Sequence, residues 1–210
     1  MEKDQHFLNK DEILERIVDA LNLKDSDEIL EIGPGFGSLT RTLLEREQGK
    51  IHSVEKDEKF IRVLELLNKE YENFSFTLGD ALEELPNSYF TKVIGNIPYS
   101  LTEPLYTKFL ELRVSYVVSL QGKKFYDIIQ REGSKWTFFV KSMYDVECLE
   151  QVSGEEFEPK TKVDSVVLNP GAGSGTPYID PYSSVLNFTG FDNEKLFLPK
   201  SSTILSLYKD

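Results

Sequence analysis

The sequence predicts an α/β fold with a doubly wound, mostly parallel sheet and an antiparallel edge. Between residues 27 and 121, short runs rich in β-branched and aromatic residues alternate with segments of helical periodicity. Such alternation is typical of a parallel sheet whose right-handed crossovers place helices on both faces. The predicted strands are Glu28–Ile32, Ile51–Val54, Phe74–Leu78, Lys92–Gly95 and Val114–Leu120. The last run is almost entirely apolar, as expected of a strand covered on both sides.

Amphipathic helices are predicted before the first strand and after the later ones. Apolar residues recur every three to four positions in these segments, which places them on one face of a helix. This spacing predicts helices at Lys10–Leu21, Leu39–Glu47, Lys59–Asn68, Glu103–Leu112 and Lys123–Arg131.

The pattern changes after residue 131. Three β-rich runs, Trp136–Ser142, Val146–Val152 and Val163–Leu168, are predicted to form antiparallel strands at one edge of the sheet. The segment Asn169–Pro177 has the composition of a flexible linker, and Tyr178–Asp210 shows only weak periodicity. We therefore predict one domain over residues 1–170, followed by a linker and a short tail over residues 171–210.

Composition narrows the class of protein. Of the 210 residues, 40% are apolar, which is enough for a sizeable core, and no apolar run approaches the roughly 20 residues that span a bilayer. The first residues lack the basic-then-apolar profile of a secretory signal. A lone cysteine, Cys148, excludes an internal disulfide and fits a reducing compartment. With only His6 and His52, no zinc site is expected. We expect a soluble, cytoplasmic, monomeric protein without a metal.

The charge distribution gives two opposite indications about nucleic acid. The formal net charge of −12 argues against it, because binding to phosphates needs clustered Lys and Arg side chains. Between residues 121 and 141, however, positive side chains are in local excess, among them Lys123, Lys124, Arg131 and Lys135. The plainer interpretation of such a run is a solvated surface.

A glycine-rich turn follows the first predicted strand and precedes a helix. Gly33, Gly35 and Gly37 let the backbone approach a ligand closely and open a helix N-terminus toward it. The spacing departs from the G-x-G-x-x-G pattern of dinucleotide sites, since Ser38 holds the position of the third glycine. Glu31, two residues before the loop, would repel a pyrophosphate but attract a sulfonium or an α-ammonium group. These features favour S-adenosylmethionine over NAD; a tight structural turn is the alternative.

Two further acids fall at the carboxyl ends of predicted strands, where open α/β sheets bind ligands. Glu55 is able to accept hydrogen bonds from both ribose hydroxyls; the alternative is an ordinary surface turn. Asp80 is able to accept from the adenine amino group while the Ala81 N–H reaches a ring nitrogen; the alternative is a helix cap. Together with Glu31 and Asn96, these residues predict a cofactor site at one edge of the sheet.

The tetrapeptide Asn96–Tyr99 ends the fourth predicted strand with residues that pack poorly and hydrogen-bond well. The Asn96 side-chain oxygen and the Ile97 carbonyl would accept both N–H bonds of an adenine amine, which localises its lone pair for attack on a methyl group. Pro98 stiffens the turn, and the Tyr99 ring would stack on a base swung out of its helix. Positioning and electrostatics would then carry most of the catalysis. A plain turn is the alternative.

Six segments of the chain occur in the order found in the ribosomal RNA adenine N6,N6-dimethyltransferases. They are QHFL at Gln5–Leu8, LEIGPGFGSLT, VEKD, GDAL, KVIGNIPYSLTEPL, and FEPKTKVDSVVL at Phe157–Leu168. From Gln5 to about Pro170 the chain therefore resembles this family, which includes the KsgA type and its antibiotic-resistance Erm relatives. The resemblance implies a seven-stranded Rossmann-like methyltransferase sheet, S-adenosylmethionine as cofactor, and methyl transfer to adenine N6 in ribosomal RNA.

The resemblance and the motifs together predict the roles of individual residues. The predicted cofactor contacts are Gln5, His6, Leu8, Glu31, Gly33, Gly35, Glu55, Lys56, Asp80, Ala81 and Asn96. The predicted catalytic group is Asn96, Ile97, Pro98, Tyr99 and Phe157. Phe157 matches the aromatic residue that sandwiches the target base opposite Tyr99, and its alternative is an edge-strand core residue. Lys123, Lys124, Arg131 and Lys135 would form an RNA-facing ridge.

Two features of the chain differ from the usual pattern of this family: its C-terminal part and its net charge. The family normally continues into a small basic helical domain, and here a short tail takes its place. With a net charge of −12, the expected partner is ribosomal RNA held in a pre-ribosomal small subunit, and the motifs lean toward the KsgA type. Two other functions stay open: a ribosome-assembly or RNA-binding factor with vestigial catalysis, and a small-molecule or protein methyltransferase on the same fold.

Overall fold

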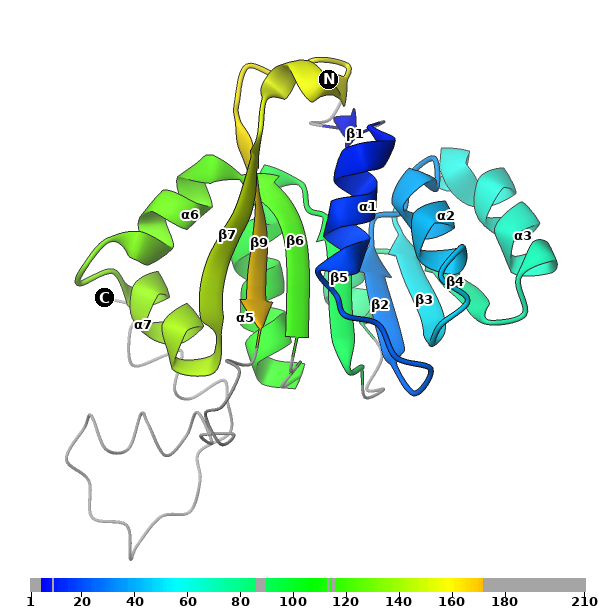
Figure 1. Cartoon of the computed structure of the whole chain (residues 1–210), viewed down its shortest axis with the longest axis horizontal. Coiled ribbons are helices and arrows are strands. Elements are labelled where there is room, and N and C mark those ends of the chain that lie inside the picture. The colour runs from blue at the N-terminus through cyan, green and yellow to red at the C-terminus, as the bar shows by residue number, and fades with distance from the viewer. Residues whose placement is uncertain (1–4, 9, 86–89, 113, 115, 172–210) are drawn as a thin grey trace, which may run out of the picture.

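The computed structural model describes residues 5–8, 10–85, 90–112, 114 and 116–171. Its centre is a seven-stranded sheet in the order β4-β3-β2-β5-β6-β9-β7, with helices on both faces (Figure 1). The bounds are β2 Glu28–Ile32, β3 Lys50–Glu55, β4 Phe74–Leu78, β5 Lys92–Asn96, β6 Tyr116–Gly122, β7 Asp145–Val152 and β9 Ser165–Gly171. Strands β2 to β6 pair in parallel, and β9 is antiparallel to both β6 and β7. The predicted fold class is confirmed.

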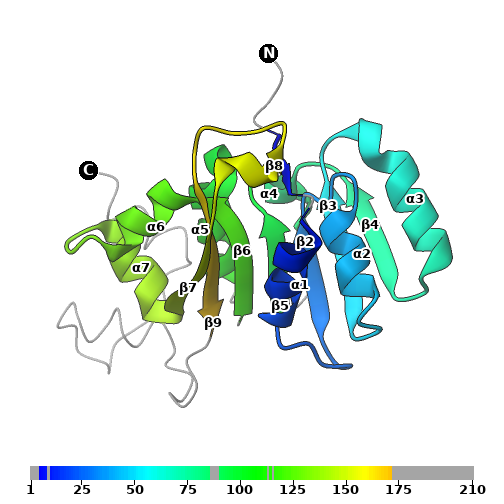
Figure 2. The same ribbon diagram turned by 45° about the horizontal axis from the view of Figure 1, so that its top comes forward.

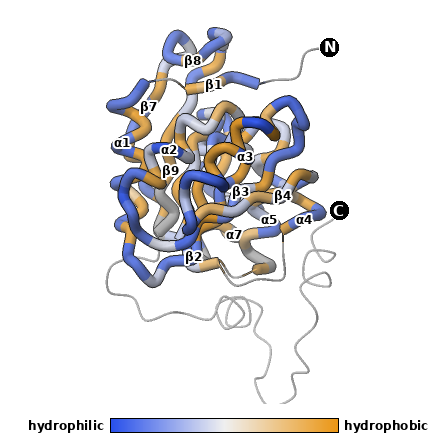
Figure 3. The backbone as a smooth tube through the Cα atoms, turned by 90° about the vertical axis from the view of Figure 1, so that its right-hand side faces the viewer, coloured by the Kyte–Doolittle hydropathy of each residue, from blue (hydrophilic) through white to orange (hydrophobic). Residues whose placement is uncertain are grey.

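Alternating side chains of the strands pack into two separate cores, one on each face of the sheet. On one face, Ile29, Ile51 and Ile94 contact helices α1 (Asp11–Asp19), α2 (Ser38–Leu44) and α3 (Ile61–Glu70). On the other face, Leu30, Val54 and Val93 contact α4 (Ala81–Glu84), α5 (Thr102–Leu112), α6 (Lys123–Gln130) and α7 (Lys135–Met143). Successive side chains of a strand point to opposite faces of the sheet. Because both sets are apolar here, both faces are covered by helices. Figure 3 shows these hydrophobic segments at the centre of the molecule and hydrophilic ones in the loops.

One predicted strand, Trp136–Ser142, is wrong, because this segment lies in helix α7. The Ser134 side chain accepts a hydrogen bond from the Trp136 N–H and so caps the helix. Trp136 and Val140 are spaced four residues apart, as one helical face requires, and both belong to the core formed with α5 and α6. Tertiary packing and a helix cap therefore outweigh the β propensity of the run WTFFV.

The C-terminal boundary also differs from the sequence prediction. Strand β9 extends to Gly171, so Asn169–Gly171, predicted to begin the linker, continues the sheet and pairs with β7. The remainder of the predicted linker and the tail, residues 172–210, lie outside the described residues. No helix in the described part of the chain is long and apolar enough to cross a membrane.

A second, two-stranded sheet lies over the carboxyl ends of the parallel strands (Figure 2). Strand β1 (Phe7–Leu8) pairs in antiparallel fashion with β8 (Phe157–Glu158), so that Leu8 lies opposite Phe157. This pairing joins two segments that are about 150 positions apart in the sequence. The small sheet thereby covers the carboxyl ends of the parallel strands.

At the opposite end of the strands, a buried ion pair joins β5 to the loop after α1. Lys92 is 8% exposed, and its Nζ lies 2.7 Å from Asp27 Oδ2 and 2.7 Å from the Leu21 carbonyl oxygen. Burial opposes ionisation of Asp27, but hydrogen bonds from Lys92 and from the Lys24 N–H outweigh it and lower the pKa of Asp27. A buried pair of this kind is costly to break from one side.

We expect Lys92→Met to lower the free energy of unfolding by about 3–5 kcal/mol, because it leaves the Asp27 carboxylate buried without its cation. The pKa of Asp27 is lower in the folded state, so this stability is present at neutral pH and is lost as the pH falls through the folded pKa. Urea denaturation at several pH values measures the difference. Lys50→Met, which removes an exposed pair with Glu28, should cost less than about 1 kcal/mol; equal costs would contradict the argument.

Candidate functional site

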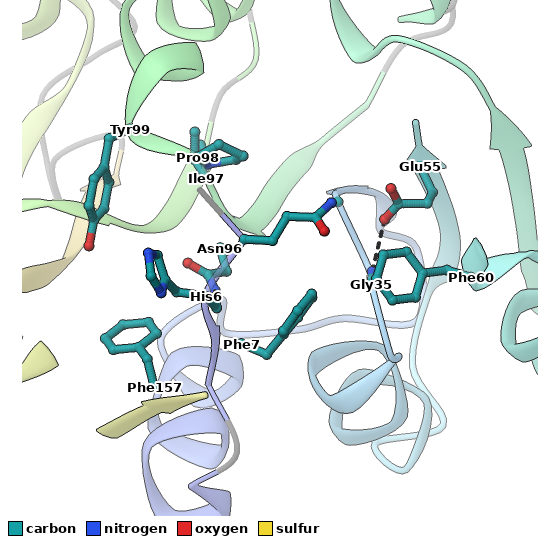
Figure 4. Close-up of a pocket in the computed structure, with 12 residues that line it drawn as sticks. His6, Phe7, Gly35, Glu55, Phe60, Asn96, Ile97, Pro98, Tyr99 and Phe157 are labelled. Carbon is teal, nitrogen blue, oxygen red and sulfur yellow. Dashed lines mark hydrogen bonds between the residues drawn. The ribbon is translucent and has the colours of Figure 1, made fainter. Parts of the chain in front are cut away.

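A cavity opens at the carboxyl ends of β2, β3 and β5, beneath β1 and β8 (Figure 4). The empty space within it, which includes open solvent at its mouth, is about 620 Å³. It is lined by Gln5, His6, Phe7, Gly33, Gly35, Glu55, Phe60, Asn96, Ile97, Pro98, Tyr99 and Phe157. A second cavity of about 440 Å³ shares Phe7, Gly33 and Asn96 with the first and is also lined by Leu8.

The glycine loop forms one wall of this cavity. Gly33 and Gly35 have φ angles of +67° and +56°, the left-handed region that glycine adopts without strain. A Cβ on Gly33 would meet nothing within 4 Å, so the backbone there faces open space, whereas a Cβ on Gly35 would lie 2.8 Å from the Phe7 ring. Phe7, Phe36 and Phe60 pack edge to face around this loop, with centroid distances of 4.8–5.7 Å. The loop is therefore open to a ligand and rimmed by aromatic rings.

The Glu55 carboxylate accepts hydrogen bonds from two backbone N–H groups, one of which belongs to the glycine loop. Its Oε2 accepts from the Gly35 N–H at 2.9 Å, drawn in Figure 4, and its Oε1 accepts from the Asp57 N–H at 2.8 Å. The carboxylate is 6% exposed and lines the cavity. It therefore lies where the sequence predicts a ribose contact.

Glu31 lies beneath the cavity and does not line it. The residue is fully buried, and its carboxylate accepts hydrogen bonds from the hydroxyls of Ser53 and Thr40. Burial raises the pKa of Glu31 to about 7; the two hydroxyls oppose this shift and the nearby charge of Glu55 adds to it. The direct attraction to a cation expected from the sequence has no geometric support here. Instead, Glu31 ties β2 to β3 and α2 under the loop.

Asp80, Lys56 and Ala81 do not line either cavity. Asp80 Oδ1 accepts from the Leu82 N–H and caps α4, while its Oδ2 lies 2.6 Å from Lys56 Nζ. The hydrogen bond from Lys56 and the cap lower the pKa of Asp80. Ala81 is buried in the core as the first residue of α4. The capping role that the sequence left as an alternative for Asp80 is therefore present, and its contact with a cofactor stays a prediction.

Asn96 lies at the junction of the two cavities, with a fixed amide. Its Nδ2 donates to the His6 carbonyl oxygen at 2.9 Å, which leaves Oδ1 as the acceptor atom of the side chain. The next peptide is also fixed, because the Ile97 N–H donates to the Leu120 carbonyl at 2.8 Å and continues the pairing of β5 with β6. The His6 ring Nδ1 lies 2.8 Å from the Pro159 carbonyl oxygen, which ties this segment to the residues after β8.

Two aromatic rings, Tyr99 and Phe157, line the same end of the cavity from different elements (Figure 4). The Tyr99 hydroxyl lies 2.8 Å from Ser165 Oγ, and a Cβ on Gly122 would come within 2.9 Å of the Tyr99 ring. Gly122 therefore leaves room for that ring. Phe157 is 3% exposed and belongs to the core cluster with Leu8, so its alternative role as a core residue is also present.

Of the predicted RNA-facing residues, Lys123 and Lys124 lie on α6, Arg131 directly follows it and Lys135 begins α7; none lines either cavity. Lys124, Arg131 and Lys135 are exposed, and Lys123 forms an ion pair with Asp127 at 2.8 Å. Two contacts connect these helices to the site: the Lys123 N–H donates to the Asp164 carbonyl at 3.0 Å, and Trp136 Nε1 donates to Glu103 Oε2 at 2.9 Å. Their role in contacting RNA stays a prediction.

Sequence reasoning missed the aromatic rim. Phe7 stands between motif residues that were assigned, and Phe60 was counted only as the apolar face of a helix. Both line the cavity, and Phe36 joins them at 55% exposure. The signal available in the sequence was Phe36, an aromatic residue directly between two loop glycines.

The geometry agrees with comparisons of the chain with known proteins. A model of the family described as ribosomal RNA adenine dimethylase matches residues 2–187. A protein of Methanopyrus kandleri named "Probable ribosomal RNA small subunit methyltransferase A" is 36% identical over 185 residues, covering 84% of this chain and 66% of the relative.

Two solved structures are similar to the fold. A dimethyladenosine transferase from Plasmodium falciparum superposes with a TM-score of 0.71 at 30% identity, covering 78% of this chain and 62% of that one. The 23S rRNA methyltransferase ErmE has a TM-score of 0.73 at 26% identity, covering 89% of this chain and 80% of that one. The chain thus spans about two thirds of the length of its curated relative from Methanopyrus.

We expect Glu31→Gln to change how stability depends on pH. The folded pKa of Glu31, about 7, lies above its ordinary value of 4.5, so the wild type loses stability as the pH rises from about 4.5 to about 7. The variant lacks this loss and should be more stable at pH 8 by at most about 3 kcal/mol, and no more stable at pH 4. Urea denaturation of both proteins across this range tests the expectation; parallel curves would contradict it.

Proposed function

The chain belongs to the ribosomal RNA adenine dimethylase family, and on this premise we propose that it transfers methyl groups from S-adenosylmethionine to the N6 amino group of adenines in ribosomal RNA. Two successive transfers to one amine give dimethyladenosine. Small-subunit RNA, held in a pre-ribosomal particle, is the proposed substrate. The monomeric state and the cytoplasmic location expected from the sequence stay predictions.

The observation that carries this proposal is the orientation of the Asn96 amide. Because Nδ2 is engaged by the His6 carbonyl, Oδ1 is the atom that accepts an N–H from an adenine amine. The Ile97 carbonyl is the proposed second acceptor; Ile97 lines the cavity, and the hydrogen bond of its N–H to the Leu120 carbonyl fixes the peptide between it and Asn96. Two acceptors localise the lone pair of the amine and make it a better nucleophile. Tyr99 and Phe157 supply the rings between which the adenine stacks.

The residues at the glycine end fit the cofactor. The cavity there combines open space over Gly33, the carboxylate of Glu55 at the end of β3 and the aromatic rings of Phe7 and Phe60, that is, polar acceptors beside apolar walls. S-adenosylmethionine, when bound, supplies an electrophilic methyl group on a sulfonium. Glu55 would orient the ribose, and the shared lining of Asn96 and Gly33 connects this end to the adenine end.

Positioning is what the chain contributes to the reaction. The amine is aligned by Asn96 and Ile97, and the stacked rings keep water away from it. The methylated amine is acidic enough to release a proton to water without a strong base. The net charge of −12 favours a substrate that the ribosomal particle already holds in place over naked RNA.

We expect Asn96→Ala to lower methylation of under-methylated small ribosomal subunits by about 10²–10³-fold, since it removes one preorganised hydrogen-bond acceptor from the reacting group. Label from the cofactor is measured in dimethyladenosine after digestion of the RNA. The matched control is Asn73→Ala, whose Nδ2 donates to the Gly49 carbonyl outside the two described cavities. It should leave the rate unchanged.

The same assay separates the competing functions. Absence of label in dimethyladenosine with the wild-type protein would overturn the proposal. Normal subunit maturation with the Asn96→Ala protein, despite lost methylation, would favour an assembly role. Label that appears in cell extract and survives ribonuclease would favour a small-molecule or protein substrate.

A further inference from the structure

The loop Pro159–Asp164 forms the outer rim between the two rings of the adenine end. It begins directly after β8, which carries Phe157, and it ends at Ser165, whose Oγ lies 2.8 Å from the Tyr99 hydroxyl. The loop therefore links the strand that carries Phe157 to the residue that contacts Tyr99. We call residues 159–164 the rim loop.

The rim loop is held by three backbone contacts to three different elements. The Pro159 carbonyl oxygen lies 2.8 Å from the His6 ring, the Thr161 N–H donates to the Gly154 carbonyl at 3.0 Å, and the Asp164 carbonyl accepts from the first N–H of α6 at 3.0 Å. The packing against Gly154 is close, because a Cβ there would lie 2.0 Å from the Thr161 oxygen. These contacts fix the backbone of the loop.

Two neighbouring side chains of the rim loop point into solvent. Val163 is 43% exposed, one of few large apolar side chains so exposed in the described part of the chain. Lys162 is exposed too, and among the described residues no carboxylate pairs with it. Lys160, in the same loop, is by contrast paired with Glu155.

Two acids, Glu158 and Asp164, are exposed nearby, so the rim is not a general basic patch. A single unpaired cation beside an exposed apolar side chain suits one defined contact better than broad attraction to phosphates. Proteins that extrude a base commonly hold the backbone with a cation and fill the vacated space in the stack with an apolar side chain.

We propose that the rim loop extrudes the target adenine: Lys162 binds the RNA phosphate beside it, and Val163 enters the space that the base leaves in the stack. This proposal rests on the proposed function and adds two positioning residues to it. Extrusion costs unstacking energy, which is smallest for a base that is already unpaired. The contribution of Val163 should therefore depend on how well the target is stacked.

The test compares Val163→Ala on two substrates, after the methylated adenines have been mapped with the wild-type protein. On under-methylated subunits we expect kcat/KM to fall about tenfold; on a short single-stranded RNA with the same adenine it should change less than twofold. A second readout replaces that adenine by 2-aminopurine in a hairpin, whose fluorescence rises on extrusion. The rise should be smaller with Val163→Ala. The matched control is Leu149→Ala, because Leu149 lies on β7 and is 40% exposed; this variant should behave as the wild type.

For the phosphate contact, Lys162→Gln should reduce the slope of log affinity against log salt by about one, and Lys50→Gln at the start of β3 should not. If the wild type methylates RNA but both variants match their controls, the rim-loop proposal fails and the proposed function stands. An equal loss on both RNAs would overturn the extrusion role of Val163. A wild type that methylates no RNA would overturn the proposed function and the rim-loop proposal with it.

Discussion

The hydrogen bond from Asn96 to the His6 carbonyl is the contact on which the rest of the site depends. It joins the central strand of the sheet to the N-terminal segment, and β1 then pairs with β8 and brings Phe157 to the cavity. Three segments that are far apart in the sequence therefore meet around one amide. Because the same bond engages Nδ2, it also leaves Oδ1 as the acceptor atom of the side chain.

At the glycine end, the two acidic residues Glu55 and Glu31 form hydrogen bonds within the protein. Both carboxylate oxygens of Glu55 accept hydrogen bonds from backbone N–H groups, and the Glu31 carboxylate accepts hydrogen bonds from side-chain hydroxyls. Two carboxylates so close together repel each other, which adds to the raised pKa of the buried one. The loop is thus stiff without a ligand, and a ligand that uses Glu55 must share it with the backbone.

The fold could be predicted further than the site. Strong periodicity located the parallel strands and their helices, because burial on both faces leaves an unambiguous pattern. The run at Trp136–Ser142 was assigned wrongly, since its β-branched and aromatic residues serve as one face of α7. Its helical state depends on a serine cap and on partners distant in sequence.

Within the site, motifs located the cavity-lining residues Asn96, Tyr99 and Phe157, but not how they are held. The capping of α4 by Asp80 and the burial of Glu31 follow from three-dimensional neighbours that spacing does not reveal. The same holds for Gly122, which lies beyond the predicted strand Val114–Leu120 and makes space for the Tyr99 ring.

The pairing of β1 with β8 has a consequence for the order of events during synthesis. Residues 7 and 8 leave the ribosome early, yet their partners are residues 157 and 158. The first strand must therefore wait until most of the chain has emerged, and contacts between such distant residues form slowly. Until residues 157 and 158 have emerged, β1 has no partner strand and the cavity lacks the ring of Phe157.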